Sequence, residues 1–156
     1  MLNLLNNLEI PIVITGGNSI IDLKIKKEIP TLSNVFNFIG ETSLKEYLIL
    51  SELSLGYIGM DTLNMHIAAS QNKRIFAIFG PTNIRMWSPW SNILKQPANG
   101  NNPIQTYGNV TIFQSSSPCE ICGVIGCGSN HGRSELRYSV KPKEIFNEVN
   151  KWYLNV

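Results

Sequence analysis

Short apolar runs rich in β-branched residues alternate along this chain with longer stretches in which apolar residues recur at helical spacing. Each apolar run stops at glycine or another turn-forming residue, which is typical of a buried strand. The runs predict strands over residues 12–15, 35–39, 55–59, 74–79 and 110–113. The intervening stretches predict helices over residues 19–29, 44–53, 63–70 and 141–153. Short strands that alternate with helices of about ten residues are typical of βαβ units, so we expect an α/β fold with a Rossmann-like parallel sheet flanked by helices.

One long segment breaks this pattern. Residues 83–108 contain several proline, asparagine and glycine residues, which predicts a long loop of the kind that often carries function. Trp87 and Trp90 lie in this segment. Ordinary core packing explains them at least as well as an exposed face that another domain would cover.

Composition and charge narrow the class of protein. With 156 residues, 43% of them apolar and 15% charged, the chain suits a single compact domain over residues 1–156. The net charge is +2 and the basic residues are dispersed, so we expect no nucleic-acid partner. We find no signal peptide and no run of roughly 20 apolar residues, which predicts a cytoplasmic protein.

Candidate chemistry lies where the predicted strands end, because ligands of open parallel sheets bind outside the carboxyl ends of the strands. At the first such end, Thr15, Gly16 and Gly17 would let a phosphate approach the backbone and the N-terminus of the next helix. A plain strand-to-helix turn explains the paired glycines equally well.

Two further strand ends carry polar side chains. Asp61, Thr62 and His66 lie within six residues; Asp61 suits sugar or ribose hydroxyls, and Thr62 suits phosphate. The alternative for Asp61 is a helix N-cap worth about 1 kcal/mol. The spacing places His66 on the same helical face as Thr62, but it favours a hydrogen-bonded core histidine over a ligand contact. Residues 79–82 predict a sharp turn with a Thr82 hydroxyl in the same crevice, and a simple β-turn explains them equally well.

The strings at these strand ends together resemble a known family. The chain reads D-T-L-N-M-H-I-A-A from Asp61 and R-I-F-A-I-F-G-P-T from Arg74. This combination resembles the C-terminal domains of glycosyltransferase family 9, the ADP-heptose:lipopolysaccharide heptosyltransferases, which carry Asp-Ser/Thr-x-x-x-His-x-x-Ala, a strand and Phe-Gly-Pro-Thr. The segments V-I-T-G-G and G-E-T-S-L extend the resemblance upstream, and it covers most of residues 11–150.

The resemblance implies the C-terminal half of a two-domain glycosyltransferase of the B type, which binds the nucleotide-sugar donor. The donor-binding set that it implies is Thr15, Gly16, Gly17, Asp61, Thr62, His66, Gly80 and Thr82. The first three would face the diphosphate. Asp61 and Thr62 would face the sugar and phosphates, and Thr82 would lie at the rim of the pocket. The implied partners are an ADP-sugar donor, with ADP-heptose expected, and a lipopolysaccharide core acceptor, with peripheral association at the cytoplasmic face of the inner membrane.

Family members also have an N-terminal acceptor-binding domain that supplies the general base. We expect that domain to be absent here, so that the chain has no catalytic residue of its own and is inactive alone. Two positions depart from the family pattern. Leu63 stands two residues after Asp61, where glycine is common, and Lys45 replaces an acidic residue that can contact the donor ribose, although Glu46 follows it.

A cluster of cysteines lies near the C-terminus. Cys119, Cys122, Cys127 and His131 fall within 13 residues, a spacing that is chemically reasonable for structural zinc. Reduced, partly buried thiols are the favoured alternative, and family 9 proteins often have a similar cysteine-rich stretch. We therefore expect no required cofactor. Two other function classes stay open: a non-catalytic nucleotide-binding module that pairs with a separate partner, and a zinc-binding interaction module.

Overall fold

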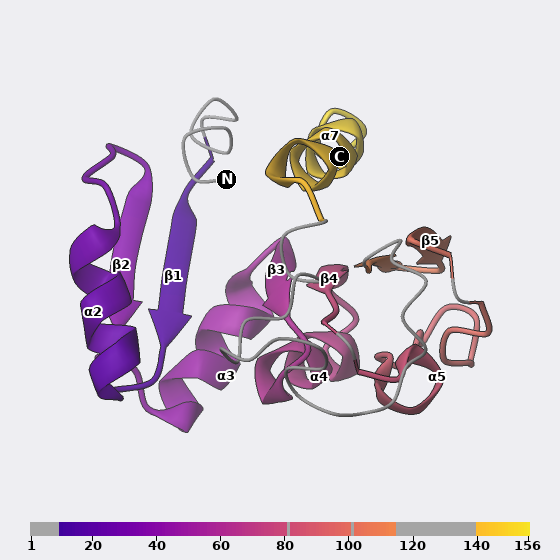
Figure 1. Cartoon of the computed structure of the whole chain (residues 1–156), viewed down its shortest axis with the longest axis horizontal. Helices are drawn as coiled ribbons and strands as arrows, with labels where there is room; N and C mark the ends of the chain where they lie inside the picture. Colours follow the sequence, from indigo (N-terminus) through magenta and orange to yellow (C-terminus); the bar gives the residue numbers. More distant parts are fainter. Residues whose placement is uncertain (1–9, 81, 101, 115–139) are drawn as a thin grey trace, which may run out of the picture. The chain divides into compact units, whose positions relative to one another are not determined.

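The computed structural model describes residues 10–80, 82–100, 102–114 and 140–156. Its elements, labelled in Figure 1, are β1 (Ile12–Gly16), α2 (Ile20–Glu28), β2 (Val35–Ile39), α3 (Leu44–Leu53), β3 (Gly56–Met60), α4 (Leu63–Ser70), β4 (Arg74–Ile78), α5 (Ile84–Trp87), β5 (Ile104–Tyr107), β6 (Val110–Phe113) and α7 (Pro142–Tyr153). Every predicted strand and helix is present, with ends within one residue of the prediction. The α/β class is confirmed.

The chain divides into two compact units, which are described separately. The first unit comprises Met1–Leu50 and Phe146–Val156, and the second comprises Ser51–Ile145. The first contains a two-stranded sheet, β1-β2, and the second a four-stranded sheet in the order β3-β4-β6-β5.

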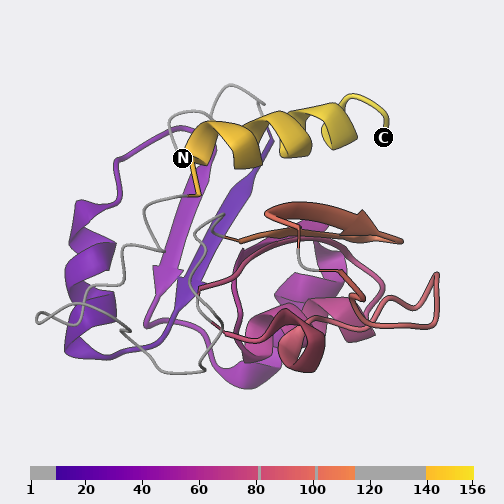
Figure 2. The same cartoon turned by 45° about the vertical axis from the view of Figure 1, so that its right-hand side comes forward.

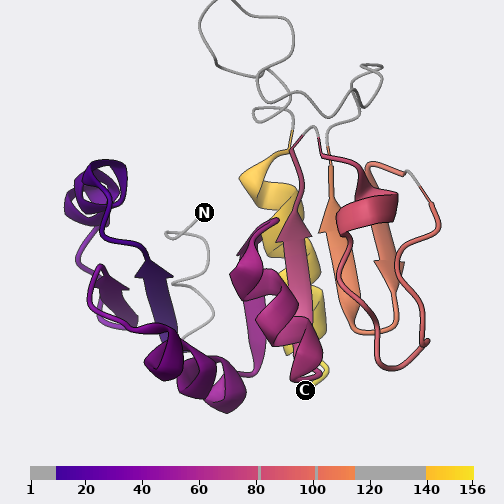
Figure 3. The ribbon, with the colours of Figure 1, turned by 90° about the horizontal axis from the view of Figure 1, so that it is seen from below.

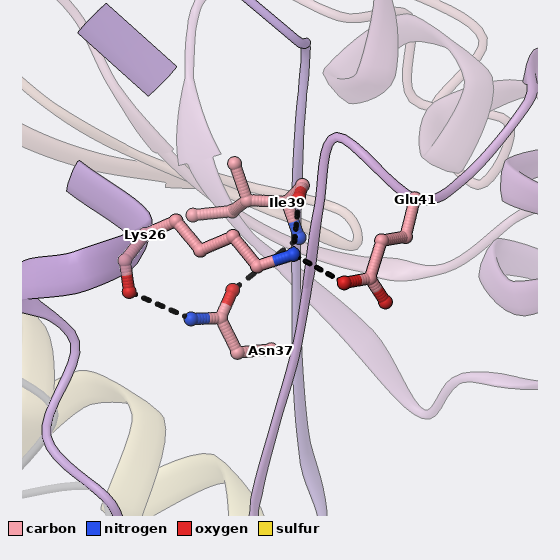
Figure 4. A network of polar contacts seen from close by, with 4 residues as sticks. All are labelled: Lys26, Asn37, Ile39 and Glu41. Carbon is pink, nitrogen blue, oxygen red and sulfur yellow. Dashed lines mark hydrogen bonds and ion pairs between the residues drawn. The ribbon is translucent and has the colours of Figure 1, made fainter. Parts of the chain in front are cut away.

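In the first unit, β1 and β2 run parallel, with Ile12 opposite Val35 and Gly16 opposite Ile39. The two strands and α2 lie side by side in Figures 1 and 2. Lys26 ties the helix to the end of β2, because its Nζ donates to the Ile39 carbonyl at 2.8 Å and pairs with Glu41 (Figure 4). This ion pair is partly exposed, so it contributes at most about 1 kcal/mol to stability.

In the second unit, β3 and β4 pair in parallel, as do β4 and β6. Figure 3 shows β5 beside β6, and these two strands form an antiparallel hairpin. The residues between them are Gly108, whose φ of +53° lies in the region that favours glycine, and Asn109. The sequence prediction did not include β5 or the short helix α5, both of which lie in the segment expected to be irregular.

The hydrophobic cluster of the second unit includes residues from one face of β4 and β6. These central strands are buried almost throughout, which suits strands covered on both faces. Helix α4 packs against β3 and β4 and buries Met65, Ala68 and Ala69. The buried cluster consists of Met65, Ala68, Ala69, Ile75, Ala77, Phe79, Ile84, Ala98, Val110 and Ile112.

The structure bears on the membrane-span search and on the packing of the two tryptophans in the long loop. No helix in the described part of the chain is both long and apolar enough to cross a bilayer. Trp87 and Trp90 are each 50% exposed, so ordinary core packing does not explain them.

Candidate functional site

The carboxyl ends of β3 and β4 bring two of the predicted strand ends together. The last pair of the register is Met60 opposite Ile78, and the Asp61 amide donates to the Ile78 carbonyl at 3.3 Å. The residues that follow β3 and β4 therefore leave the sheet side by side. Asp61 and Thr62 lie on one of these connections, and Gly80 and Thr82 lie on the other.

The connection after β3 leads directly into the N-terminus of α4. Thr62 is the N-cap residue, but its side chain forms no capping hydrogen bond. Its Oγ1 instead points back to the Met60 carbonyl, 3.4 Å away. The first turn of α4 contains no acidic residue, so the partial positive charge of this helix end has no carboxylate from within its own turn. Asp61 is half-buried and precedes the cap.

Tyr57 lies against this connection, and sequence reasoning assigned it no role beyond strand β3. Its hydroxyl donates to the Met60 carbonyl at 3.0 Å and lies 3.5 Å from Thr62 Oγ1. Residues 57 and 59 share a face of the strand, and a Cβ on Gly59 would come within 2.3 Å of the Tyr57 oxygen. The absence of a side chain at Gly59 therefore lets the tyrosine ring lie along the strand and reach Thr62.

Burial raises the pKa of Tyr57 above its usual value, the hydrogen bond with Thr62 lowers it, and the Asp61 charge raises it further. The net direction is upward. Tyr57 therefore remains a protonated donor throughout the neutral pH range. Glycine two residues after an aromatic residue in a predicted strand is the sequence signal that could have identified this contact.

The connection after β4 is held from β6 by Gln114. The Gln114 side-chain amide donates to the carbonyls of Gly80 and Thr82, at 3.3 Å each. Gln114 directly follows a predicted strand, so the strand-end argument applied to residues 110–113 would have found it. Thr82 Oγ1 is buried and has no hydrogen-bond partner among the described residues.

Gly80 is open: a Cβ there would meet nothing within 4 Å. No other described part of the chain therefore lies close to the position of a Cβ at Gly80. Pro81, which completes the predicted turn, lies outside the described residues.

His66 lies one turn into α4 and is half-buried. Met65, Ala68 and Ala69 form the buried face of the helix, so the histidine flanks that face rather than belonging to the core cluster. The prediction that His66 binds the donor stays a prediction.

The other predicted strand end, Thr15-Gly16-Gly17, belongs to the first unit. Ser19 caps α2 in a reciprocal capping box with Asp22, whose Oδ2 accepts from the Ser19 hydroxyl at 2.6 Å. A Cβ on Gly17 would lie 2.9 Å from that carboxylate oxygen. Gly17 thus makes room for the cap, as the plain strand-to-helix turn requires. A phosphate at this helix end would also meet the negative charge of Asp22.

Helix α3 begins in the same manner. Glu46 Oε2 accepts from both the amide and the hydroxyl of Ser43, at 2.7 Å each. These hydrogen bonds lower the pKa of Glu46. Glu46, which follows the family-divergent Lys45, is therefore engaged as a capping carboxylate.

Five predicted donor-binding residues thus lie in the second unit and three in the first. The first group is Asp61, Thr62, His66, Gly80 and Thr82, and the second is Thr15, Gly16 and Gly17. Within the described ranges, no group of three or more histidine, cysteine and acidic side chains could hold a metal ion. The cluster Cys119, Cys122, Cys127 and His131 lies outside those ranges.

Comparisons with known proteins agree with the motifs at these strand ends. A family profile described as glycosyltransferase family 9 (heptosyltransferase) matches residues 1–116. Lipopolysaccharide heptosyltransferase 3 of Escherichia coli is 32% identical over 88 residues, which is 54% of this chain and 26% of that protein. The chain thus matches about a quarter of the length of this curated relative. No solved structure matches the chain significantly.

Proposed function

Because the chain belongs to glycosyltransferase family 9, we propose that it binds the nucleotide-sugar donor of a transferase at the carboxyl ends of β3 and β4. The observation that carries this proposal is the N-terminus of α4. Its N-cap residue Thr62 forms no side-chain capping hydrogen bond, and Asp61 precedes it. On the neighbouring connection, Thr82 has a buried hydroxyl that lacks a hydrogen-bond partner among the described residues. Backbone N–H groups at a helix N-terminus suit phosphate oxygens.

The proposed roles follow from the chemistry of each group. The α4 N-terminus and the Thr62 hydroxyl hold the diphosphate, whose negative charge increases as its bond to the sugar breaks. Tyr57 positions Thr62 and does not itself contact the donor. Asp61 accepts hydrogen bonds from sugar hydroxyls, because a carboxylate repels the phosphates but accepts from neutral hydroxyl groups. Thr82 forms the rim, and the donor provides the hydrogen-bond partner that its buried hydroxyl lacks among the described residues. His66 and Gly80 are the remaining proposed donor-binding residues of the second unit.

We propose separately that Thr15, Gly16 and Gly17 of the first unit contact the diphosphate, as the family resemblance implies. This proposal has less support than that for the residues of the second unit, because Asp22 brings a carboxylate to the helix end that these three residues precede.

The donor and acceptor classes in the proposal rest on the similarity to lipopolysaccharide heptosyltransferase 3 and on the family resemblance of the strand-end motifs. A lipopolysaccharide heptosyltransferase transfers heptose, so we propose ADP-heptose as the donor and a lipopolysaccharide core sugar as the acceptor. The acceptor hydroxyl attacks the sugar carbon, its proton passes to a base, and ADP leaves. We propose that residues outside these 156 supply that base, that this chain is inactive alone, and that the reaction takes place in the cytoplasm at the inner membrane.

Calorimetric titration of the chain with ADP and with ADP-heptose tests the proposal, with UDP and GDP as controls for the base. Thr62→Val keeps the side-chain shape and removes the hydroxyl, so it should weaken both ligands by roughly tenfold, the value of a hydrogen bond to a charged group. Asp61→Asn should weaken ADP-heptose and leave ADP bound equally well or more tightly. Ser70→Ala, at the exposed opposite end of α4, is the matched control and should change neither.

The difference between the two variants is the decisive outcome. Equal effects of Asp61→Asn on both ligands would remove the sugar-contact role of Asp61. A folded chain that binds neither ADP nor ADP-heptose would contradict the donor-binding proposal.

A further inference from the structure

A loop of the second unit exposes an unusual number of large apolar side chains. We call residues 84–98 the tryptophan loop. Five of its side chains are largely exposed: Met86 (70%), Trp87 (50%), Trp90 (50%), Ile93 (64%) and Leu94 (46%). They fall within nine consecutive residues. Clusters of this kind on a protein surface mark an interaction site.

Hydrogen bonds from buried side chains hold the loop against the β5-β6 hairpin. Ser91 is fully buried, and its Oγ donates to Asn109 Oδ1 at 3.1 Å and accepts from the Leu94 amide at 3.3 Å. Asn109 in turn donates to the Lys73 carbonyl at 2.7 Å. A side chain on Gly108 would come within 2.1 Å of Ser91 Oγ, so the hairpin packs tightly against the loop.

Both sides of the loop have similar anchors. Ser88 is buried and its Oγ accepts from the Ala98 amide at 3.0 Å, while Tyr107 donates to the Pro89 carbonyl at 2.8 Å. A short antiparallel bridge joins Ser91 to Gln96. The buried serines Ser88 and Ser91 thus fix the shape of the loop, while the five apolar side chains named above are exposed. The five apolar side chains are therefore exposed while the loop is held in a defined conformation.

The charged residues in the sequence segment that contains the loop all have one sign. From residue 62 to residue 119 the sequence contains no aspartate or glutamate, whereas it contains Lys73, Arg74, Arg85 and Lys95. The rest of the chain carries nine basic and eleven acidic residues, so the positive charge of the protein is concentrated in this segment. Arg85 and Lys95 are both exposed and flank the five apolar side chains.

We propose that the tryptophan loop docks on an anionic phospholipid surface. Exposed tryptophan and aliphatic side chains enter the boundary between headgroups and acyl chains, while flanking arginine and lysine bind the anionic headgroups. The complete absence of acidic side chains in the segment suits a uniformly negative partner. A protein interface would more often exclude lysine from the contact.

This inference goes beyond the proposed donor site and does not depend on it. Docking would bring the chain to the surface on which a lipid-bearing acceptor lies. Vesicle binding is measured without nucleotide and nucleotide binding without vesicles, so either proposal can fail while the other stands.

Co-sedimentation of the 156-residue chain with vesicles tests the docking. Vesicles of phosphatidylcholine alone are compared with vesicles that contain phosphatidylglycerol, at low and high salt. We expect binding that requires phosphatidylglycerol and falls as salt rises. Arg85→Gln with Lys95→Gln should weaken it by roughly 30-fold, from the usual contribution of each basic residue near such a surface. The matched control, Lys24→Gln with Lys27→Gln, removes the same charge from exposed positions of α2 and should have a much smaller effect.

The apolar contribution has its own variants. Trp87→Ser with Trp90→Ser should abolish vesicle binding, whereas Leu154→Ser with Val156→Ser, at exposed positions near the C-terminus, should not. In a Trp152→Phe background the loop holds both remaining tryptophans, so their emission should shift to the blue when phosphatidylglycerol vesicles are added. Circular dichroism checks that each variant folds.

Three outcomes would overturn the proposal. The first is absence of binding to phosphatidylglycerol vesicles. The second is binding that the loop variants leave unchanged. The third is self-association that Trp87→Ser with Trp90→Ser abolishes, without any lipid binding, which would assign the loop to a second copy of the chain.

Discussion

Replacing Gly59 with alanine should disturb the candidate site through Tyr57. The new Cβ would lie 2.3 Å from the Tyr57 oxygen and 2.6 Å from its Cζ. Ordinary contacts between such atoms are about 3.5 Å, so the ring must move by roughly 1 Å. That movement breaks the hydrogen bond from Tyr57 to the Met60 carbonyl and the contact with Thr62.

The expected cost follows from three terms. Overpacking costs about 1–3 kcal/mol, and the lost hydrogen bond costs about 0.5–1.5 kcal/mol. Replacing glycine within a strand recovers about 0.5–1 kcal/mol. We therefore expect Gly59→Ala to lower the free energy of unfolding by about 2 kcal/mol and to weaken ADP binding, because Thr62 loses its positioning partner.

A double-mutant cycle with Tyr57→Val tests this reasoning. Valine suits a strand and removes the ring, so Gly59→Ala should be neutral or slightly stabilising in that background. Urea unfolding of the four proteins, followed by far-UV circular dichroism, gives the coupling free energy, which should be about 2 kcal/mol or more. An equal cost of Gly59→Ala in both backgrounds would refute the proposed clash.

Three other predictions concern groups outside that contact. The Ser43 hydrogen bonds lower the pKa of Glu46 in the folded chain. The stabilisation that they give is present above the unfolded pKa of 4.5 and is lost as the pH falls through the lowered folded pKa. Acid unfolding of Glu46→Gln should therefore depend less on pH than that of wild type. Burial raises the pKa of Tyr107 to about 12, so its contribution is complete below pH 10.0 and is lost as the pH rises towards 12. Tyr107→Phe should cost about 1 kcal/mol at neutral pH and reduce the alkaline loss of stability, as urea unfolding at pH 8 and pH 11 would show. For the cysteine cluster we expect reduced thiols without stoichiometric metal, and elemental analysis that finds one zinc ion per chain would contradict this.

The regular elements could be predicted because each has a local signal. Apolar runs such as Ile12–Gly16 and Arg74–Ile78 are short and end at turn residues, and α7 has a strong apolar face after Pro142. Strand β5 was missed because Ile104–Tyr107 lies at the sheet edge with alternate residues exposed, so it lacks a continuous apolar run. The Gly-Asn pair that follows it is a hairpin signal that the prediction did not use.

Only part of the candidate site was predictable, because strand ends identify the positions of residues and not the side chains that contact them. Asp61 and Thr62 follow β3 as the apolar run predicts, and their role in donor binding stays a prediction. The Tyr57 contact was not predicted, because it depends on the empty space at Gly59. The paired glycines in the sequence could not distinguish a phosphate-binding turn from a helix cap. The short distance from a Cβ at Gly17 to the Asp22 carboxylate gives a structural explanation for that glycine.

The central claim is that a nucleoside diphosphate binds at the α4 N-terminus. Amide chemical-shift mapping of the isotope-labelled chain during titration with ADP tests it most directly, since the chain of 17.4 kDa suits such spectra. We predict that the largest saturable shifts fall on the amides of residues 61–64 and on Thr82, and that Thr62→Val reduces them. Saturable shifts confined to other parts of the chain, or no shifts at all from a folded protein, would contradict the claim.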